Sequence, residues 1–334
     1  MFDILEKVNE WLAASTPLAI ATVVETWGSA PRQAGAKMVV TADTTMIGSV
    51  SGGCVETAVI GEMIDSLADQ QPRLLAFGVS DDEAWSVGLA CGGSIAVFVE
   101  PLNLAWWRLL EQYADQRFAT ATVLSGDLAG AKILFPPSGK PFMMTMVSQS
   151  MLVPLMRFAE TATSTTRILV GDRDILFEVY RPRPRLVIVG GAHVAMALQQ
   201  YAAILGFRVL LIDPRRAFAT PERFPHVESI SHEYPHIALQ SIPLDGDTYL
   251  ALLTHDPKID DPALQTALPS DVAYIGVLSS RRTHEKRLER LTAAGVDPAL
   301  FGRIRTPIGL NIGARTPEEI ALAIVSEIIA VRNA

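Results

Sequence analysis

Hydrophobic residues in the second half of the chain form short continuous runs, separated by stretches with helical spacing. Short apolar runs are typical of buried parallel strands, whereas apolar residues every three or four positions indicate helices. The predicted strands are Leu186–Val189, Arg208–Ile212, Tyr249–Leu253 and Val272–Val277, and the predicted helices are Gly191–Leu205, Pro262–Leu268, Ser280–Ala294 and Pro317–Val331. This alternation predicts an α/β domain with a Rossmann-like, doubly wound parallel sheet.

The first 180 residues follow a different pattern, in which strands and helices do not alternate regularly. The predicted helices are Phe2–Ala14, Val55–Leu67 and Leu104–Tyr113, and the predicted strands are Leu18–Glu25, Lys37–Thr41, Met46–Val50, Arg73–Val79 and Ser94–Glu100. Residues 118–180 are interpreted as further β structure with one helical interruption. No internal repeat of fixed period is visible. The mixture predicts an α+β domain before the Rossmann-like one.

Alternating prolines separate these two regions. Residues 181–185 read Arg-Pro-Arg-Pro-Arg, and each proline fixes φ and removes an N–H donor, so an extended connector is expected. A chain of 334 residues is also long enough for two domains. We therefore expect an α+β domain at 1–180, a linker at 181–185 and a Rossmann-like domain at 186–334.

Composition narrows the class of protein. Hydrophobic residues make up 49% of the chain and charged residues 19%, which is typical of a compact folded protein and excludes extensive disorder. The most apolar stretch, near the C-terminus, is interrupted by Ser326 and Glu327, so no membrane span is expected. The first residues lack the basic region of a signal peptide, and two cysteines are too few for a secreted scaffold. These features predict a cytoplasmic protein.

The formal net charge is −8, and the acidic excess lies in residues 1–180. Residues 181–334 are nearly neutral and contain no continuous basic stripe. Proteins that bind nucleic acid through its phosphates need such a stripe, so nucleic acid is not an expected partner. Local anion sites in the second half remain compatible with this distribution.

Gly190 follows a predicted strand and opens a predicted helix, as in the dinucleotide-binding turn Gly-x-Gly-x-x-Gly/Ala. Ala192 replaces the second glycine, and Asp213 ends the next strand, where it can hydrogen-bond a ribose. Gly190, Gly191 and His193 are candidate contacts for an anion at the helix N-terminus. The turn either binds a nucleotide or pterin-type phosphate or is a degenerate nucleotide site, and His193 either contacts a ligand or bonds the neighbouring loop.

Further segments follow predicted strands and should reach the same edge of the sheet, where doubly wound folds bind ligands. They are residues 254–261, 279–282 and 306–313. His255, Asp256 and Asp260 either bind a metal or make capping and loop hydrogen bonds. Arg281 or Arg282 can face an anion. The glycine-rich third segment is suited to close approach of a ligand.

Both cysteines lie in glycine-rich loops of the first half. Cys54 falls where a helix begins, and a thiol there gains thiolate character that suits sulfur transfer or metal contact. The alternative is a buried, inert thiol. Arg32 is either an anion contact or an ordinary ion-pair partner. The candidate ligand-binding residues of these loops are Arg32, Ser51, Gly52, Gly53, Cys54, Cys91, Gly92 and Gly93.

Several of these motifs together resemble the XdhC/CoxI family, the molybdenum-cofactor maturation factors also called xanthine dehydrogenase accessory proteins. The matching segments are 26–32, 49–56 and 88–93 in the first half, and 190–195, 213–215, 274–282 and 307–319 in the second. The last segment and the paired Gly-Gly-Cys and Cys-Gly-Gly loops are the specific features. The family commonly has Gly-Ala-Gly-His, where this chain has Gly190-Gly191-Ala192-His193.

The resemblance implies a chaperone that binds the molybdenum cofactor, favours its sulfurated form and delivers it to a molybdenum hydroxylase such as xanthine dehydrogenase or an aldehyde oxidoreductase. The cofactor is molybdopterin or its dinucleotide form, and Cys54 and Cys91 are the candidate contacts for molybdenum or its sulfur. The implied partners are the apo-hydroxylase, a cysteine desulfurase and a second copy of the chain. A carrier of this kind needs no turnover chemistry.

Two other classes of function are compatible with the sequence. An NAD(P)-dependent oxidoreductase is favoured by the Rossmann pattern and Asp213, whereas Ala192 and the lack of an evident catalytic dyad argue against it. A regulatory or interaction module with a vestigial nucleotide fold is the third possibility.

Overall fold

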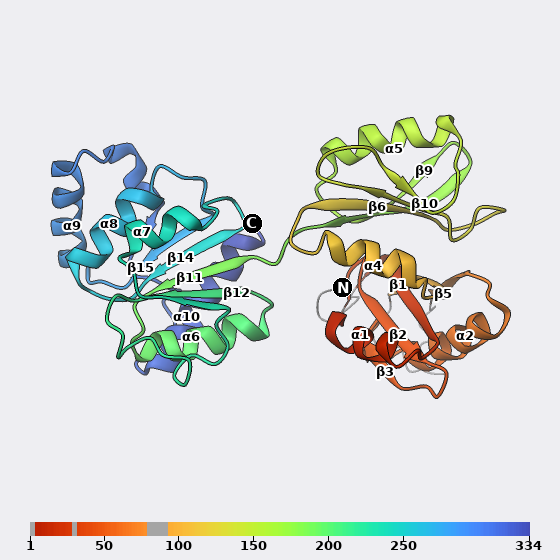
Figure 1. Ribbon diagram of the computed structural model, residues 1–334, viewed down its shortest axis with the longest axis horizontal. Helices are drawn as coiled ribbons and strands as arrows, with labels where there is room; N and C mark the ends of the chain where they lie inside the picture. The colour runs from red at the N-terminus through yellow and green to blue at the C-terminus, as the bar shows by residue number, and fades with distance from the viewer. Residues whose placement is uncertain (1–3, 29–31, 79–92) are drawn as a thin grey trace. The chain divides into compact units, whose positions relative to one another are not determined.

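The computed structural model describes residues 4–28, 32–78 and 93–334, and the chain divides into two compact units, Met1–Pro182 and Arg183–Ala334. The first unit contains antiparallel sheets, and the second contains a parallel sheet with helices on both faces (Figure 1). The predicted fold class, an α+β region followed by a Rossmann-like α/β domain, is therefore confirmed. Within the described residues, no helix has the length and apolarity needed to span a bilayer.

Sheet A of the first unit has five antiparallel strands in the order β3-β2-β1-β5-β4. The strands are β1 (Leu18–Trp27), β2 (Lys37–Thr41), β3 (Met46–Gly48), β4 (Arg73–Gly78) and β5 (Ser94–Pro101). Alternate residues of β1 face opposite sides, so Ala19 and Ala21 pack under helix α2 (Glu56–Asp69), whereas Leu18 and Ile20 pack near helix α1 (Leu5–Ala13). Both faces of β1 are thus buried.

Sheet B completes the first unit and has the order β8-β7-β6-β10-β9. Its strands are β6 (Phe118–Val123), β7 (Lys132–Phe135), β8 (Phe142–Met143), β9 (Thr166–Val170) and β10 (Arg173–Tyr180). Helix α5 (Gln149–Thr161) covers one face through Met151, Leu152 and Leu155. Helix α4 (Leu104–Gln112) follows β5 and lies between the two sheets (Figure 1). Trp107 packs against apolar residues of α1 and sheet A, and Trp106 packs against apolar residues of sheet B.

Sheet C of the second unit is parallel throughout, with the order β13-β12-β11-β14-β15-β16. Its strands are β11 (Arg185–Val189), β12 (Arg208–Ile212), β13 (Ser229–Ser231), β14 (Thr248–Leu252), β15 (Tyr274–Val277) and β16 (Ile304–Arg305). Helices α6 (His193–Ile204) and α10 (Pro317–Arg332) cover one face. The other face is covered by α7 (Pro235–Ala238), α8 (Pro257–Ala267) and α9 (Arg281–Ala293).

Some element boundaries differ from the sequence pattern for identifiable reasons. β11 starts at Arg185, within the proline-rich segment, because the Arg185 guanidinium is held by Asp245 at 2.5 Å. α8 starts at Pro257 instead of Pro262, because the Asp256 side chain caps it by accepting from the Lys258 N–H. The first residues of β11 and α8 therefore depend on polar contacts, which the spacing of apolar residues in the sequence does not reveal.

The glycine-rich segment after β16 is pressed against α10. Gly309 has φ of +91°, and a Cβ there would lie 2.9 Å from backbone atoms of Ala323 and Ile324. Its N–H donates to the Glu327 carboxylate at 2.9 Å, and the Tyr274 hydroxyl donates to the same oxygen at 2.6 Å. Gly309 is therefore required by close packing within the protein.

We predict that Gly309→Ala destabilises the protein by about 2–5 kcal/mol, because the left-handed conformation and the overpacking against α10 both disfavour a side chain. Gly313→Ala is the matched control: its φ is +74°, but no atom lies within 4 Å of the added Cβ. That variant should lose only about 1–2 kcal/mol. Urea unfolding of both variants tests this, and equal losses would show that contact with α10 is unimportant.

Candidate functional site

A buried carboxylate organises the glycine-rich loop between β3 and α2. Glu56, the first residue of α2, accepts hydrogen bonds from the side chains of Ser49 (2.8 Å) and Ser51 (2.5 Å). It also accepts from the backbone N–H groups of Ser51 (2.9 Å), Gly52 (2.9 Å) and Gly53 (2.8 Å). The loop is thus wrapped around a carboxylate of its own chain, which gives three backbone N–H groups of the loop a hydrogen-bond partner.

These hydrogen bonds keep Glu56 ionised. Burial by itself would raise the pKa of Glu56, but the hydrogen bonds from Ser51 and Ser49 outweigh it and lower the pKa to about 2. The N–H groups of Ser51, Gly52 and Gly53 were predicted to contact a cofactor, and in the structure they contact Glu56. An incoming phosphate would have to displace this carboxylate to use them.

Cys54 lies at the end of this loop, just before α2. Its N–H donates to the Ser51 hydroxyl at 3.0 Å, and its half-buried, unpaired thiol borders the apolar core beneath α2. Gly53 has φ of +120°, and no atom of the described residues lies within 4 Å of the position of a Cβ there. The loop therefore places a half-buried thiol near a helix N-terminus.

The Arg32 side chain ties a second loop to this one. Its Nε donates to the Ser49 carbonyl at 3.0 Å, so the segment after β1 and the Cys54 loop are joined. Cys91 and Gly92 lie outside the described residues. Gly93 immediately precedes β5.

The glycine turn after β11 is closed by neighbouring segments of the same unit. Gly190 has φ of +105°, and a Cβ there would lie 2.6 Å from the Thr254 side chain. A Cβ on Gly191 would lie 2.5 Å from the Phe218 carbonyl oxygen. Gly190 and Gly191 were candidate contacts for an anion, and in the structure each glycine makes room for another part of the protein.

Asp213 was predicted to bind a ribose, but its carboxylate is fully buried and engaged by the protein. One oxygen accepts from the Gly191 N–H at 2.8 Å, and Arg215 donates to both oxygens at 2.8 and 2.9 Å. Burial raises the pKa of Asp213, but these hydrogen bonds outweigh it and hold the pKa below its ordinary value. Asp213 therefore fixes the glycine turn and the segment after β12.

Three predicted ligand contacts are exposed at strand ends of sheet C. His193 is the first residue of α6, and Arg281 is the first residue of α9 after the capping residue Ser280. His255 follows β14 with φ of +62°. Each stands where a parallel strand leads into a helix, which is the edge at which such folds bind ligands. Their side chains are available to an anion there.

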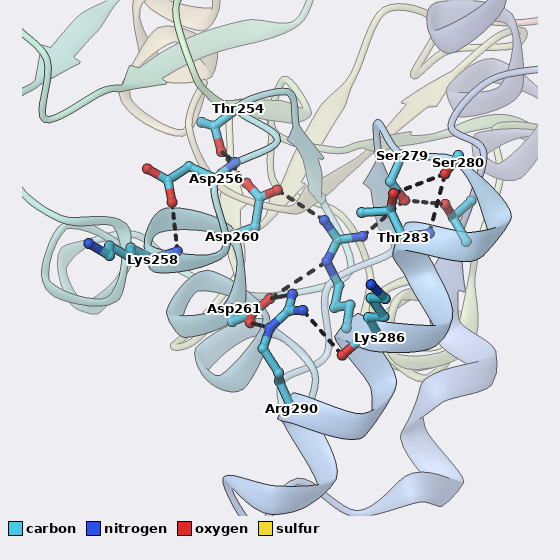
Figure 2. A network of polar contacts seen from close by, with 12 residues as sticks. Thr254, Asp256, Lys258, Asp260, Asp261, Ser279, Ser280, Thr283, Lys286 and Arg290 are labelled. Atoms are coloured by element: carbon cyan, nitrogen blue, oxygen red, sulfur yellow. Dashed lines mark hydrogen bonds and ion pairs between the residues drawn. The ribbon is translucent and has the colours of Figure 1, made fainter.

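A buried polar chain connects the ends of β14, β15 and β16 (Figure 2). Thr254 donates to Asp260 at 2.5 Å, and Arg287 donates to Asp260 at 3.1 Å and to Ser279 at 3.0 Å. The Ser279 hydroxyl lies 3.0 Å from that of Thr306. Burial of Asp260 raises its pKa despite the neighbouring cation. This chain holds the strand ends of the candidate edge in a fixed arrangement.

The sequence analysis did not identify Arg287, which is only 1% exposed. The available signal was the spacing of Arg287 and Arg290 on one face of a helix, opposite the pair Asp260–Asp261; Arg290 contacts Asp261 at 2.5 Å. Asp260 makes a loop hydrogen bond of the kind predicted, because it accepts from the Thr254 hydroxyl. Among the described residues, no cluster of three His, Cys, Asp or Glu side chains is arranged to hold a metal ion.

Comparison with known proteins matches both units. Residues 11–78 match the model of the XdhC and CoxI family, and residues 186–328 match that of the XdhC Rossmann domain. A crystal structure described as a xanthine dehydrogenase from Bacillus halodurans is 25% identical, with a TM-score of 0.81, and covers 98% of this chain and 95% of that one. The class defined by this fold is thus an XdhC-type protein.

Curated relatives agree with this class along nearly the whole chain. A Bacillus subtilis protein, named as a probable subunit of xanthine dehydrogenase, is 30% identical, covering 94% of this chain and 93% of its own length. The molybdenum cofactor insertion chaperone PaoD of Escherichia coli is 30% identical, and the match covers 98% of this chain and 88% of PaoD. The uncharacterized Escherichia coli protein YqeB is 28% identical, and this chain spans 44% of its length. The chain belongs to the XdhC/CoxI family.

We predict that Glu56→Gln destabilises the protein by roughly 3 kcal/mol at pH 7, as follows from a pKa lowered from 4.5 to about 2. The stabilisation by Glu56 is complete above pH 5 and is lost as the pH falls from about 5 to 2, so wild type and variant should converge in acid. Urea unfolding across this pH range measures the difference. Glu62→Gln, at an exposed position of the same helix, should have little effect, and a pH-independent difference would contradict the account.

Proposed function

We propose that this protein is a chaperone that binds the molybdenum cofactor as cargo and inserts it into an apo molybdenum hydroxylase. The observation that carries the proposal is the 30% identity to the molybdenum cofactor insertion chaperone PaoD over 331 residues, which include both units. The match to a protein named as a probable part of xanthine dehydrogenase supports a hydroxylase of that class as the client.

The chemistry of the exposed residues fits such cargo. The molybdenum cofactor has a dithiolene-bound metal at one end and a phosphate at the other, so a carrier needs a soft contact and an anion contact. Cys54 supplies a half-buried thiol near the start of α2. His193, His255 and Arg281 supply exposed nitrogen donors at strand ends. We assign the thiol loop of the first unit to contact with the metal or its sulfur, and the sheet C edge of the second unit is a candidate anion site.

The finer steps of the proposal follow the family resemblance. The protein favours the sulfurated form of the cofactor, and a cysteine desulfurase supplies the sulfur. The protein acts as a homodimer in the cytoplasm. The cargo is molybdopterin or its dinucleotide form, and Cys91 is a second candidate thiol contact. Arg282 is a second candidate for the anion contact beside Arg281.

The alternative of an NAD(P)-dependent oxidoreductase is disfavoured by the turn after β11. In that class a carboxylate at the end of the second strand takes the ribose hydroxyls. Here Asp213 is fully buried and accepts from Arg215 and Gly191. We therefore propose a carrier and no hydride transfer.

The direct test is cargo capture followed by transfer. Protein purified from a molybdate-supplied host should retain molybdenum and pterin in equal molar amounts, measured by metal analysis and pterin fluorescence. Adding it to an apo-hydroxylase should restore that enzyme's activity, whereas heat-denatured protein should not. Absence of both retention and activation would refute the proposal.

Cys54→Ser tests the thiol within this scheme. The variant should fold like wild type, because serine preserves the size of the side chain and the Cys54 N–H bond to Ser51. We expect its retained molybdenum to fall at least tenfold. Cys91→Ser alone, and Cys54→Ser combined with Cys91→Ser, show which of the two thiols contacts the cofactor. Equal retention by wild type and the double variant would exclude a thiol contact while leaving cargo binding itself intact.

A further inference from the structure

Within the described residues, the first unit contains the same succession of elements twice. α1, β1, β2, β3, α2, β4 and β5 form the first succession, and α4, β6, β7, β8, α5, β9 and β10 form the second. Sheet A has the order 3-2-1-5-4 within its succession, and sheet B has the same order within its own. The two halves, residues 5–101 (copy 1) and 104–180 (copy 2), therefore share one topology.

Short sequence matches fall at equivalent places in the two copies. Ala21-Thr22-Val23 in β1 corresponds to Ala121-Thr122-Val123 in β6, and Ala34-Gly35-Ala36-Lys37 before and in β2 corresponds to Ala129-Gly130-Ala131-Lys132 before and in β7. Gly35 and Gly130 have φ of +88° and +82°. Each donates its N–H to the equivalent valine carbonyl, at 2.8 and 2.9 Å.

Two buried ion pairs join the copies reciprocally. Lys37 of copy 1 contacts Glu178 of copy 2 at 2.8 Å, and Lys132 of copy 2 contacts Glu100 of copy 1 at 2.6 Å. All four residues are at most 9% exposed. The lysines occupy equivalent positions in β2 and β7, and the glutamates occupy equivalent positions in β5 and β10. Each copy therefore contributes one lysine and one glutamate to the two ion pairs.

The apolar residues that pack between the copies also come from equivalent positions. One buried cluster contains Val24 and Phe98 of copy 1 together with Leu124 and Leu176 of copy 2. Val24 and Leu124 each follow the Ala-Thr-Val match, and Phe98 and Leu176 each lie two residues before the paired glutamate. Reciprocal contact between equivalent residues is the signature of a two-fold, self-complementary interface.

We infer that the first unit consists of two copies of one fold, joined through a self-complementary sheet face whose fitting partner is a second copy of the same fold. The ion pairs specify this partner, because a buried charge without its counterpart is strongly destabilising. Only copy 1 has the Gly-Gly-Cys loop at residues 49–55, and copy 2 has 144–148 at that place, with neither glycine nor cysteine.

Charge reversal in the full chain tests the reciprocal pairing. Lys37→Glu or Glu178→Lys alone should lower the melting temperature by about 10 °C, because each leaves like charges buried together. The matched double variant should recover at least half of that loss. Lys132→Glu and Glu100→Lys, alone and combined, should change the melting temperature in the same way and by a similar amount. Circular dichroism measures these melting temperatures.

The mismatched double variant Lys37→Glu with Glu100→Lys is the control. It places like charges at both pairs and should show the sum of the two losses. Recovery in this variant, or coupling at one pair without the other, would overturn the inference.

Neutral variants keep the test decisive if charge reversal prevents folding. Lys37→Met removes the cation from the buried Glu178 carboxylate, which keeps only the hydrogen bond from the Tyr180 hydroxyl at 3.1 Å, and Lys37→Met with Glu178→Leu removes both charges. The double variant should fold with a melting temperature near that of wild type and well above the single variant. A double variant no more stable than Lys37→Met would contradict the pairing. The result does not depend on whether the protein carries a cofactor.

Discussion

The candidate thiol loop depends on the carboxylate of Glu56. A loop with consecutive glycines has high conformational entropy when unfolded, so holding it in one shape requires several strong contacts. Glu56 provides them through hydrogen bonds to the backbone and side chains of residues 49–53. Asp213 has a comparable part in the second unit, where it binds the Gly191 N–H. In both places an internal carboxylate fixes a glycine-rich turn.

The parallel sheet was predictable because its central strands are buried on both faces and therefore appear as continuous apolar runs. β13 and β16 were missed because three and two residues are too few to form a pattern. Sheet B was less clear from the sequence because every residue of β6 and β7 is buried, so no alternation marks its strands. The duplication was hidden because the connections differ in length: two residues join β9 to β10, whereas a long segment separates β4 from β5.

The positions of candidate site residues were predictable, but their partners were not. Hydrophobic patterning places Asp213 and Asp260 at strand and helix ends. It does not reveal that Arg215 and Arg287 neutralise them, because the ligand-binding and structural uses of a carboxylate leave the same local sequence. Glycine has the same ambiguity. Gly190 and Gly191 were candidate contacts for an anion, and only the structure shows that the groups packed against them are Thr254 and Phe218.

The ionised Glu56 also places a negative charge inside the thiol loop. A phosphate of charge near −2 brought close to Cys54 would meet a fixed negative charge a few residues away, in surroundings where screening by water is weak. A group of lower negative charge meets a smaller barrier. If the molybdenum cofactor is the cargo, this repulsion disfavours any pose in which its phosphate lies at the thiol loop.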